Sequence, residues 1–206
     1  GLDGMKTLDE SRKLIPEECF TIADAKRGDI GNTATMYAKA FLEQMDFDSI
    51  TIAPYMGQDS VEPFLQFKEK WAIVLGLTSN KGNLDFQRKK IDGTPLYELV
   101  MKTAMQWGTD ENTMFVVGAT NEEDFEHIRT FCPNHFLLVP GVGAQGGDLE
   151  KLSQYGLNKD IGLLVNSTRG IIYASNGKDF AERAREEALA INEQMKSLID
   201  KYSPSV

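Results

Sequence analysis

The chain has 206 residues, of which 41% are hydrophobic and 26% are charged, and its formal net charge is −9. This length and composition are typical of a globular protein, so we expect residues 1–206 to form a single domain. The acidic balance argues against nucleic acid or an anionic membrane as the main partner, because both attract basic surfaces. No apolar run reaches the length of a membrane span and no secretory leader is visible, so we expect a cytoplasmic location.

The two cysteines, Cys19 and Cys132, lie near the edges of predicted strands and do not have the spacing of metal ligands. His127 and His135 are the only histidines, so a zinc site is poorly supported. We therefore expect both cysteines to be reduced packing residues, and we expect no metal site.

Apolar periodicity predicts that helices and strands alternate along the chain. In chain order we expect a helix over 5–15, a strand over 20–23, a helix over 33–45, a strand over 49–53, a helix from 59, a strand over 71–77, a helix over 96–107, a strand over 114–118, a helix over 121–131, a strand over 136–139, a helix over 148–155, a strand over 162–166 and a final helix over 181–198. Repeated βα units imply a parallel sheet, either doubly wound or closed into a (β/α)₈ barrel. Because the chain opens on a helix and shows six strands, it looks like a barrel without its first two strands.

The segment 24–33, Asp-Ala-Lys-Arg-Gly-Asp-Ile-Gly-Asn-Thr, places charges where the first strand leads into a helix, and we expect it to form the turn. Asp24 and Lys26 are two residues apart on an extended chain, so their side chains face the same way. A solvated loop with a local ion pair is the simplest interpretation of such a segment. A functional interpretation requires support from the rest of the chain.

A polar stretch over 78–94 follows the third strand and is too long for an ordinary connection. It is a candidate lid over a binding site, and a flexible insertion without a role is equally compatible with its composition.

The fifth strand is followed by Gly141, Gly143 and Gly146 in the spacing G-x-G-x-x-G. This pattern invites a dinucleotide-binding interpretation, but that fingerprint belongs on the first βα turn and needs an acidic residue after the next strand. Here the next strand ends in Asn-Ser-Thr-Arg over 166–169. We therefore do not predict a dinucleotide site.

A phosphate site accounts better for the same residues, because barrels often hold phosphate between the loops after their last two strands. Gly141, Gly143 and Gly147 would let the backbone approach an anion, Gln145 would donate hydrogen bonds, and Arg169 would bind bidentately. The alternative is that the glycines only make a turn and Arg169 forms a surface ion pair.

Lys26 lies between two carboxylates, Asp24 and Asp29, which would keep it protonated. It would then act as a cation and proton donor rather than as a Schiff-base nucleophile. No flavin, thiamine or pyridoxal signature is evident, so we expect chemistry without a cofactor, performed by charges and one proton donor.

The pattern Asp24-x-Lys26-x-x-Asp29-Ile30-x-x-Thr33, with the glycine-rich loop and Arg169, closely resembles the orotidine 5′-phosphate decarboxylase family. The similarity is strongest to the bacterial branch with the motif Asp-Ala-Lys-Arg-Gly-Asp-Ile-Gly-Asn-Thr, and it spans almost the whole chain. It implies a (β/α)₈ TIM barrel that forms a homodimer. The activity implied is cofactor-independent conversion of orotidine 5′-monophosphate to uridine 5′-monophosphate and CO₂, in de novo pyrimidine biosynthesis.

The resemblance also implies roles for individual residues. Asp24 would lie against the substrate carboxylate, Lys26 would protonate C6 as CO₂ leaves, and Asp29 would reach the active site of the partner subunit. The substrate-binding residues implied are Ile30 and Thr33 near the partner's ligand, Ser79 at the pyrimidine edge, and Pro140, Gly141, Gly143, Gln145 and Arg169 around the phosphate.

In this family the first strand ends in an aspartate and the second in a lysine, and the chain begins after both. Asp3 runs directly into a predicted helix, so we do not assign it the aspartate's role. We therefore expect a barrel domain that is incomplete at its N-terminus. Two alternatives stay open: a metal-dependent sugar-phosphate decarboxylase or aldolase of the same superfamily, and a non-catalytic phosphate-binding barrel.

Overall fold

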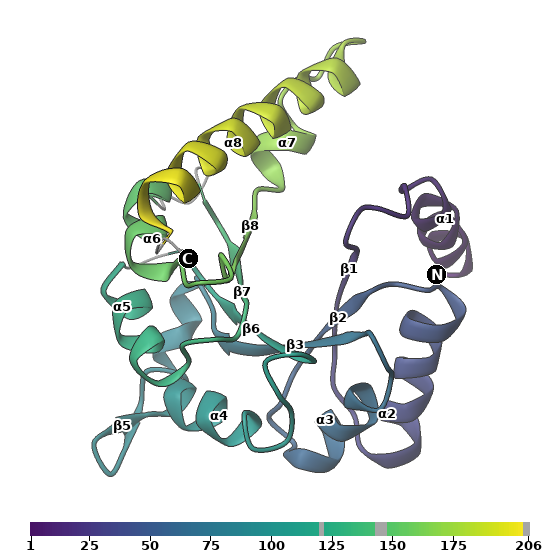
Figure 1. The fold of residues 1–206 in the computed structure, drawn as a ribbon. Helices are drawn as coiled ribbons and strands as arrows, with labels where there is room; N and C mark the ends of the chain where they lie inside the picture. Colours follow the sequence, from purple (N-terminus) through teal and green to yellow (C-terminus); the bar gives the residue numbers. More distant parts are fainter. Residues whose placement is uncertain (120–121, 143–147, 204–206) are drawn as a thin grey trace. The chain divides into compact units, whose positions relative to one another are not determined.

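The computed structural model describes residues 1–119, 122–142 and 148–203. Helices and strands alternate along the chain (Figure 1), and the main sheet has six strands hydrogen-bonded in the order β1-β2-β3-β6-β7-β8. The chain divides into two compact units, Gly1–Leu75 with Thr103–Met114, and Gly76–Lys102 with Phe115–Val206. The expectation of a single domain remains a prediction.

The first unit contains the first strands of the sheet. Its elements are α1 (Leu2–Lys13), β1 (Ile22–Arg27), α2 (Gly31–Ala38), a π-helix η1 (Lys39–Gln44), β2 (Ser49–Ile52), α3 (Gln58–Leu65), and the beginnings of β3 (Trp71–Leu77) and β6 (Thr113–Val117). β2 pairs in parallel with β1 on one side and with β3 on the other. All four residues of β2 are buried, as expected for a strand of a parallel sheet that is covered on both faces.

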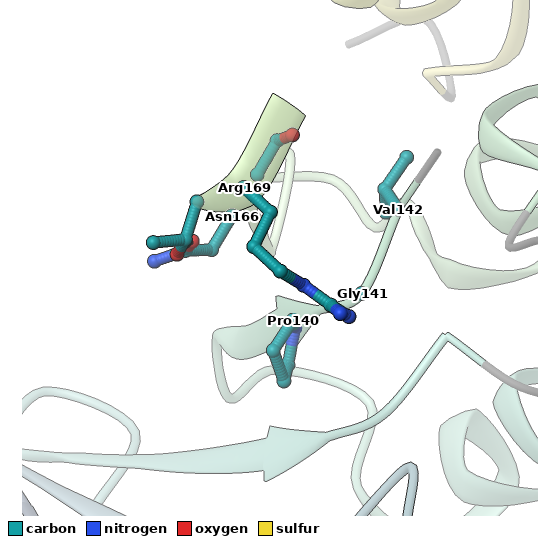
Figure 2. A pocket seen from close by; sticks show the side chains of 7 residues that line it. Pro140, Gly141, Val142, Asn166 and Arg169 are labelled. Atoms are coloured by element: carbon teal, nitrogen blue, oxygen red, sulfur yellow. Dashed lines mark hydrogen bonds between the residues drawn. The ribbon is translucent and has the colours of Figure 1, made fainter. Parts of the chain in front are cut away.

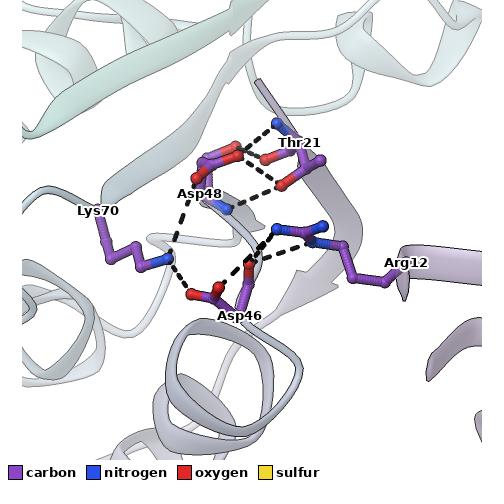
Figure 3. Close-up of polar contacts among 6 residues, drawn as sticks. Arg12, Thr21, Asp46, Asp48 and Lys70 are labelled. Atoms are coloured by element: carbon purple, nitrogen blue, oxygen red, sulfur yellow. Dashed lines mark hydrogen bonds and ion pairs between the residues drawn. The ribbon is translucent and has the colours of Figure 1, made fainter. Parts of the chain in front are cut away.

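A polar network lies at the amino ends of these strands (Figure 3). Arg12 of α1 donates to the backbone carbonyl of Asp46 (2.8 Å from Nη2), and Lys70 Nζ lies 2.6 Å from Asp46 Oδ1. Asp48 Oδ2 accepts hydrogen bonds from the backbone N–H (2.7 Å) and the hydroxyl (2.6 Å) of Thr21. The hydrogen bond from Lys70 holds the pKa of Asp46 below its usual value. Polar contacts at this end of a parallel sheet typically serve stability.

The second unit contains the remaining strands. Its elements are the end of β3, a 3₁₀ turn η2 (Lys81–Leu84), the hairpin β4 (Lys90–Ile91) and β5 (Thr94–Pro95), α4 (Leu96–Ala104), the rest of β6, α5 (Glu122–Phe131), β7 (Leu137–Pro140), α6 (Leu149–Gly156), β8 (Leu163–Asn166), α7 (Arg169–Ile172) and α8 (Phe180–Tyr202). β7 pairs in parallel with β6 and with β8. The long helix α8 packs along α6 and α7 (Figure 1). Within the described residues, no helix has the length and apolarity to cross a membrane.

Most element boundaries shift by a few residues from the sequence-based expectations, and three of the differences change the local structure. β1 runs to Arg27, so Asp24 and Lys26 belong to the strand and not to the turn after it. The second helix changes to π geometry at Lys39. The third helix begins at Gln58, one residue before the expected start, with Gly57 as its N-cap and no side-chain capping bond.

The segment 78–94 is folded rather than irregular. Its end forms the β4–β5 hairpin, and Arg88 makes two hydrogen bonds to Asp124 of α5, at 3.1 and 2.5 Å. The side chain of Gln87 accepts from the backbone N–H of Thr78 at 2.7 Å. These bonds close the segment on itself and attach it to α5, and a lid function for it remains a prediction.

Candidate active site

The carboxyl end of β1 contains a bulge that carries Asp24 and Lys26. The parallel register pairs Ala23 with Ile50 and then Arg27 with Ile52, so three residues of β1 lie opposite a single residue of β2. Lys26 has φ of +46°, a left-handed conformation that costs a non-glycine residue about 1–2 kcal/mol. Bulges of this kind redirect side chains and are common next to active sites.

Asp24 and Lys26 form an ion pair through Asp24 Oδ1 and Lys26 Nζ, as the shared direction of their side chains predicted. The exposed fractions of the two side chains are 61% and 53%, so a ligand can reach both groups. Thr51, the β2 residue opposite the bulge, donates its hydroxyl to Asp24 Oδ1 (3.0 Å) and accepts from the backbone N–H of Lys26 (2.9 Å). No signal in the sequence marks Thr51, because a threonine in a strand is ordinary.

The other predicted residues of this motif lie at the start of α2. Asp29 Oδ1 accepts from the backbone N–H of Ile30 at 2.8 Å, and Ile30 is the N-cap of the helix. Ile30 is 53% exposed and Thr33 is exposed on the first turn. Ile30 and Thr33 are therefore on the surface of the first unit, and Asp29 is half-buried.

In the second unit, the ends of β7 and β8 border a cavity of about 110 Å³ (Figure 2). The lining residues are Pro140, Gly141, Val142, Asn166, Ser167, Thr168 and Arg169. Figure 2 shows the Arg169 side chain extending from the start of α7 toward Gly141. Gly141 has φ of +95°, which glycine adopts without strain. The cavity has room for a group of several heavy atoms, because one water occupies about 30 Å³ of liquid.

The predicted residues Pro140, Gly141 and Arg169 therefore share one cavity. Gly143 and Gln145, which were expected to complete the phosphate site, lie outside the described residues. At the end of this loop, Asp148 caps α6 by accepting from the backbone N–H groups of Glu150 and Lys151.

Ser79 follows β3 and lies against the end of β6. A Cβ atom on Gly118 would be 2.6 Å from the backbone nitrogen of Ser79 and 2.7 Å from its Cβ. Gly118 therefore allows the Ser79 backbone to approach β6, and a larger residue there would displace the serine. The glycine at the end of the fourth predicted strand was the only sign of this contact in the sequence.

The sequence matches a known protein family over most of its length. The model of the orotidine 5′-phosphate decarboxylase / HUMPS family matches residues 2–184. The chain belongs to this family. A relative from Flavobacterium johnsoniae named orotidine 5′-phosphate decarboxylase is 57% identical over 203 residues, which are 97% of this chain and 74% of the relative. A relative of the same name from Bacteroides fragilis is 54% identical over 191 residues, or 92% of this chain and 69% of the relative.

Solved structures with a similar fold carry the same family name. The OMP decarboxylase of Leishmania donovani has a TM-score of 0.81 and 34% identity, covering 94% of this chain and 75% of the other. The orotidine 5′-monophosphate decarboxylase of Methanocaldococcus jannaschii, in complex with the inhibitor BMP, has a TM-score of 0.68 and 26% identity, covering 90% and 79%. The neighbours are TIM barrels, which confirms the predicted fold class and the predicted family.

Proposed function

We propose that this protein decarboxylates orotidine 5′-monophosphate to uridine 5′-monophosphate and CO₂ in pyrimidine biosynthesis, without a cofactor. Family membership and relatives of that name at 50–57% identity support the reaction. The observation that carries the assignment to residues is the exposed Asp24–Lys26 ion pair on the β1 bulge. Catalytic residues in barrels typically lie at this carboxyl end of the strands.

The chemistry requires a cation next to C6 of the substrate. When the bond between C6 and the carboxylate breaks, its electron pair stays on C6 and the resulting carbanion has no adjacent group to take up the charge. The Lys26 ammonium stabilises this charge and then donates a proton to C6, after which solvent restores the lysine proton. Asp24 pairs with the Lys26 ammonium group and lies against the substrate carboxylate. We weight stabilisation of the carbanion above repulsion of the bound substrate.

The second group of residues binds parts of the substrate that do not react. Arg169 and the backbone around Pro140 and Gly141 border a cavity that fits a phosphate, and Arg169 supplies its positive charge. Gly143 and Gln145 add further contacts to the phosphate, and Ser79 binds the pyrimidine edge. Binding of the phosphate positions the ring and so lowers the entropic part of the barrier.

The protein acts as a homodimer in the cytoplasm, with Asp29 contributing to the partner's active site and Ile30 and Thr33 near the partner's ligand. The exposure of Ile30 (53%) and of Met36 (54%) on the same helix supports this proposal. Ile30 is the N-cap of this helix and Met36 lies in its second turn, so both apolar side chains are available to contact a second chain.

The direct test is incubation of the full-length protein with orotidine 5′-monophosphate, followed by ultraviolet absorbance and by CO₂ release. We expect loss of substrate absorbance with one CO₂ for each uridine 5′-monophosphate, at the same rate with and without a metal chelator. Absence of turnover would contradict the proposal. Activity toward a sugar phosphate that the chelator abolishes would favour the metal-dependent alternative.

A further inference from the structure

The hydroxyl of Thr51 lies where the pairing between β1 and β2 is interrupted. Regular pairing stops after Ala23 and resumes at Arg27, so the backbone between them lacks its usual partners on β2. Thr51 is fully buried, with 0% of its surface exposed. Its hydroxyl accepts from the Lys26 N–H (2.9 Å) and donates to Asp24 Oδ1 (3.0 Å).

One hydroxyl can make both bonds at once, because it has one proton to donate and lone pairs to accept. The first bond holds the backbone of Lys26 in its left-handed conformation, with φ of +46°. The second bond holds the carboxylate that pairs with Lys26 Nζ. Thr51 therefore restrains Lys26 at both ends, through its backbone nitrogen and through the partner of its ammonium group.

We propose that Thr51 is a positioning residue for Lys26, which aims the ammonium group through these two hydrogen bonds without touching the substrate. The inference depends on the proposed decarboxylation, in which Lys26 donates the proton. A restraint of this kind contributes to the rate because a proton donor displaced by about 1 Å can cost about 100-fold in activity.

A purely structural role is the competing explanation, because a β-branched residue also fills space in a buried strand. Two substitutions separate the roles. Thr51→Val keeps the shape and removes the hydroxyl, whereas Thr51→Ser keeps the hydroxyl and removes the methyl group. Ser49→Ala is the matched control, because Ser49 is also fully buried on β2 but donates its hydroxyl to the Thr21 carbonyl (3.0 Å), away from Lys26.

The experiment measures kcat and KM for orotidine 5′-monophosphate in the full-length protein and the three variants. We expect Thr51→Val to lower kcat about 10- to 100-fold with KM changed less than about 3-fold, and Thr51→Ser and Ser49→Ala to stay within about 3-fold of the unsubstituted protein. Equal losses in the valine and serine variants, or in the valine variant and Ser49→Ala, would overturn the proposal, as would a valine variant with unchanged kcat.

Hydrogen exchange of the Lys26 backbone amide, followed by NMR in lysine-labelled protein, gives a readout that does not depend on activity. We expect protection of this amide in the unsubstituted protein and in Thr51→Ser, and faster exchange in Thr51→Val if that variant folds. An unprotected Lys26 amide in the unsubstituted protein would overturn the proposal even if the valine variant fails to fold. If the unsubstituted protein has no decarboxylase activity, the proposed function fails, and the amide measurement still tests the contact.

Discussion

Arg169 is the charged side chain of the cavity at the ends of β7 and β8, and it extends toward the backbone of Gly141. A guanidinium group binds phosphate with two parallel hydrogen bonds, and bonds to a charged group contribute about 1.5–3 kcal/mol. We therefore expect Arg169→Ala to raise KM for orotidine 5′-monophosphate by about 10- to 100-fold, measured by steady-state kinetics.

A matched control is Arg183→Ala on α8. Arg183 is also an exposed arginine of the second unit, and its side chain pairs with Asp179 (3.3 Å) and Glu186 (2.7 Å). Because such surface pairs contribute little, we expect KM to stay unchanged in this variant. Equal KM values in the two variants would show that Arg169 does not bind the phosphate.

Among individual residues, those that could be predicted from the sequence have side chains that are unusual for their position. Asp24, Lys26 and Arg169 stand out because charges follow apolar strands. Thr51 and Gly118 do not stand out, because each acts through a contact with a residue far away in the sequence, and both residue types are ordinary in strands and at strand ends.

Among the helices, α5 carries an arginine, Arg129, that joins it to several neighbouring segments. Arg129 donates four hydrogen bonds to backbone carbonyls: Gly156 at the end of α6 (2.8 Å), Gly162 before β8 (2.8 Å), His135 before β7 (2.8 Å) and Cys132 after α5 (3.0 Å). Burial lowers the pKa of Arg129 to about 10, which leaves the guanidinium charged at neutral pH. A single side chain thus connects the ends of two helices with the starts of two strands.

Replacing this arginine should destabilise the fold without touching the proposed chemistry. We expect Arg129→Met to lower the free energy of unfolding by about 2–4 kcal/mol, because it leaves several carbonyls without partners. Urea denaturation measures this change, with Arg185→Met on the exposed surface of α8 as the control. A loss no larger than that of the control would contradict the proposed connecting role.

The order of helices and strands was predictable because apolar runs and amphipathic stretches alternate and are separated by turn residues. The barrel class was predictable from the family resemblance. The end of β1 was not predictable from the same signals. Its last residues are charged and Lys26 has positive φ, so the strand continues only because a bulge and the Thr51 hydroxyl replace regular pairing.

At the scale of the whole molecule, the proposed dimer predicts an experimental result that an active site formed within one chain would not give. If Lys26 acts in its own subunit and Asp29 acts in the partner's site, a dimer of one Lys26→Ala subunit and one Asp29→Ala subunit contains one intact site. A mixture refolded from equal amounts of the two variants should therefore recover about a quarter of the unsubstituted activity.

The control mixture combines Lys26→Ala with the double variant Lys26→Ala/Asp29→Ala, in which no dimer has an intact site. Both mixtures are assayed with orotidine 5′-monophosphate. If the first mixture is as inactive as the second, Lys26 and Asp29 do not act across a subunit boundary.

The central claim is that Lys26, held on the β1 bulge beside Asp24, is the group that makes decarboxylation fast. Its most direct test is kcat for orotidine 5′-monophosphate in the unsubstituted protein, in Lys26→Ala, and in Lys13→Ala as an exposed lysine control. Lys26→Ala should fold, because its side chain is 53% exposed, and should lose at least about 10³-fold in kcat, while Lys13→Ala keeps full activity. A folded Lys26→Ala variant with a near-normal kcat would contradict the claim.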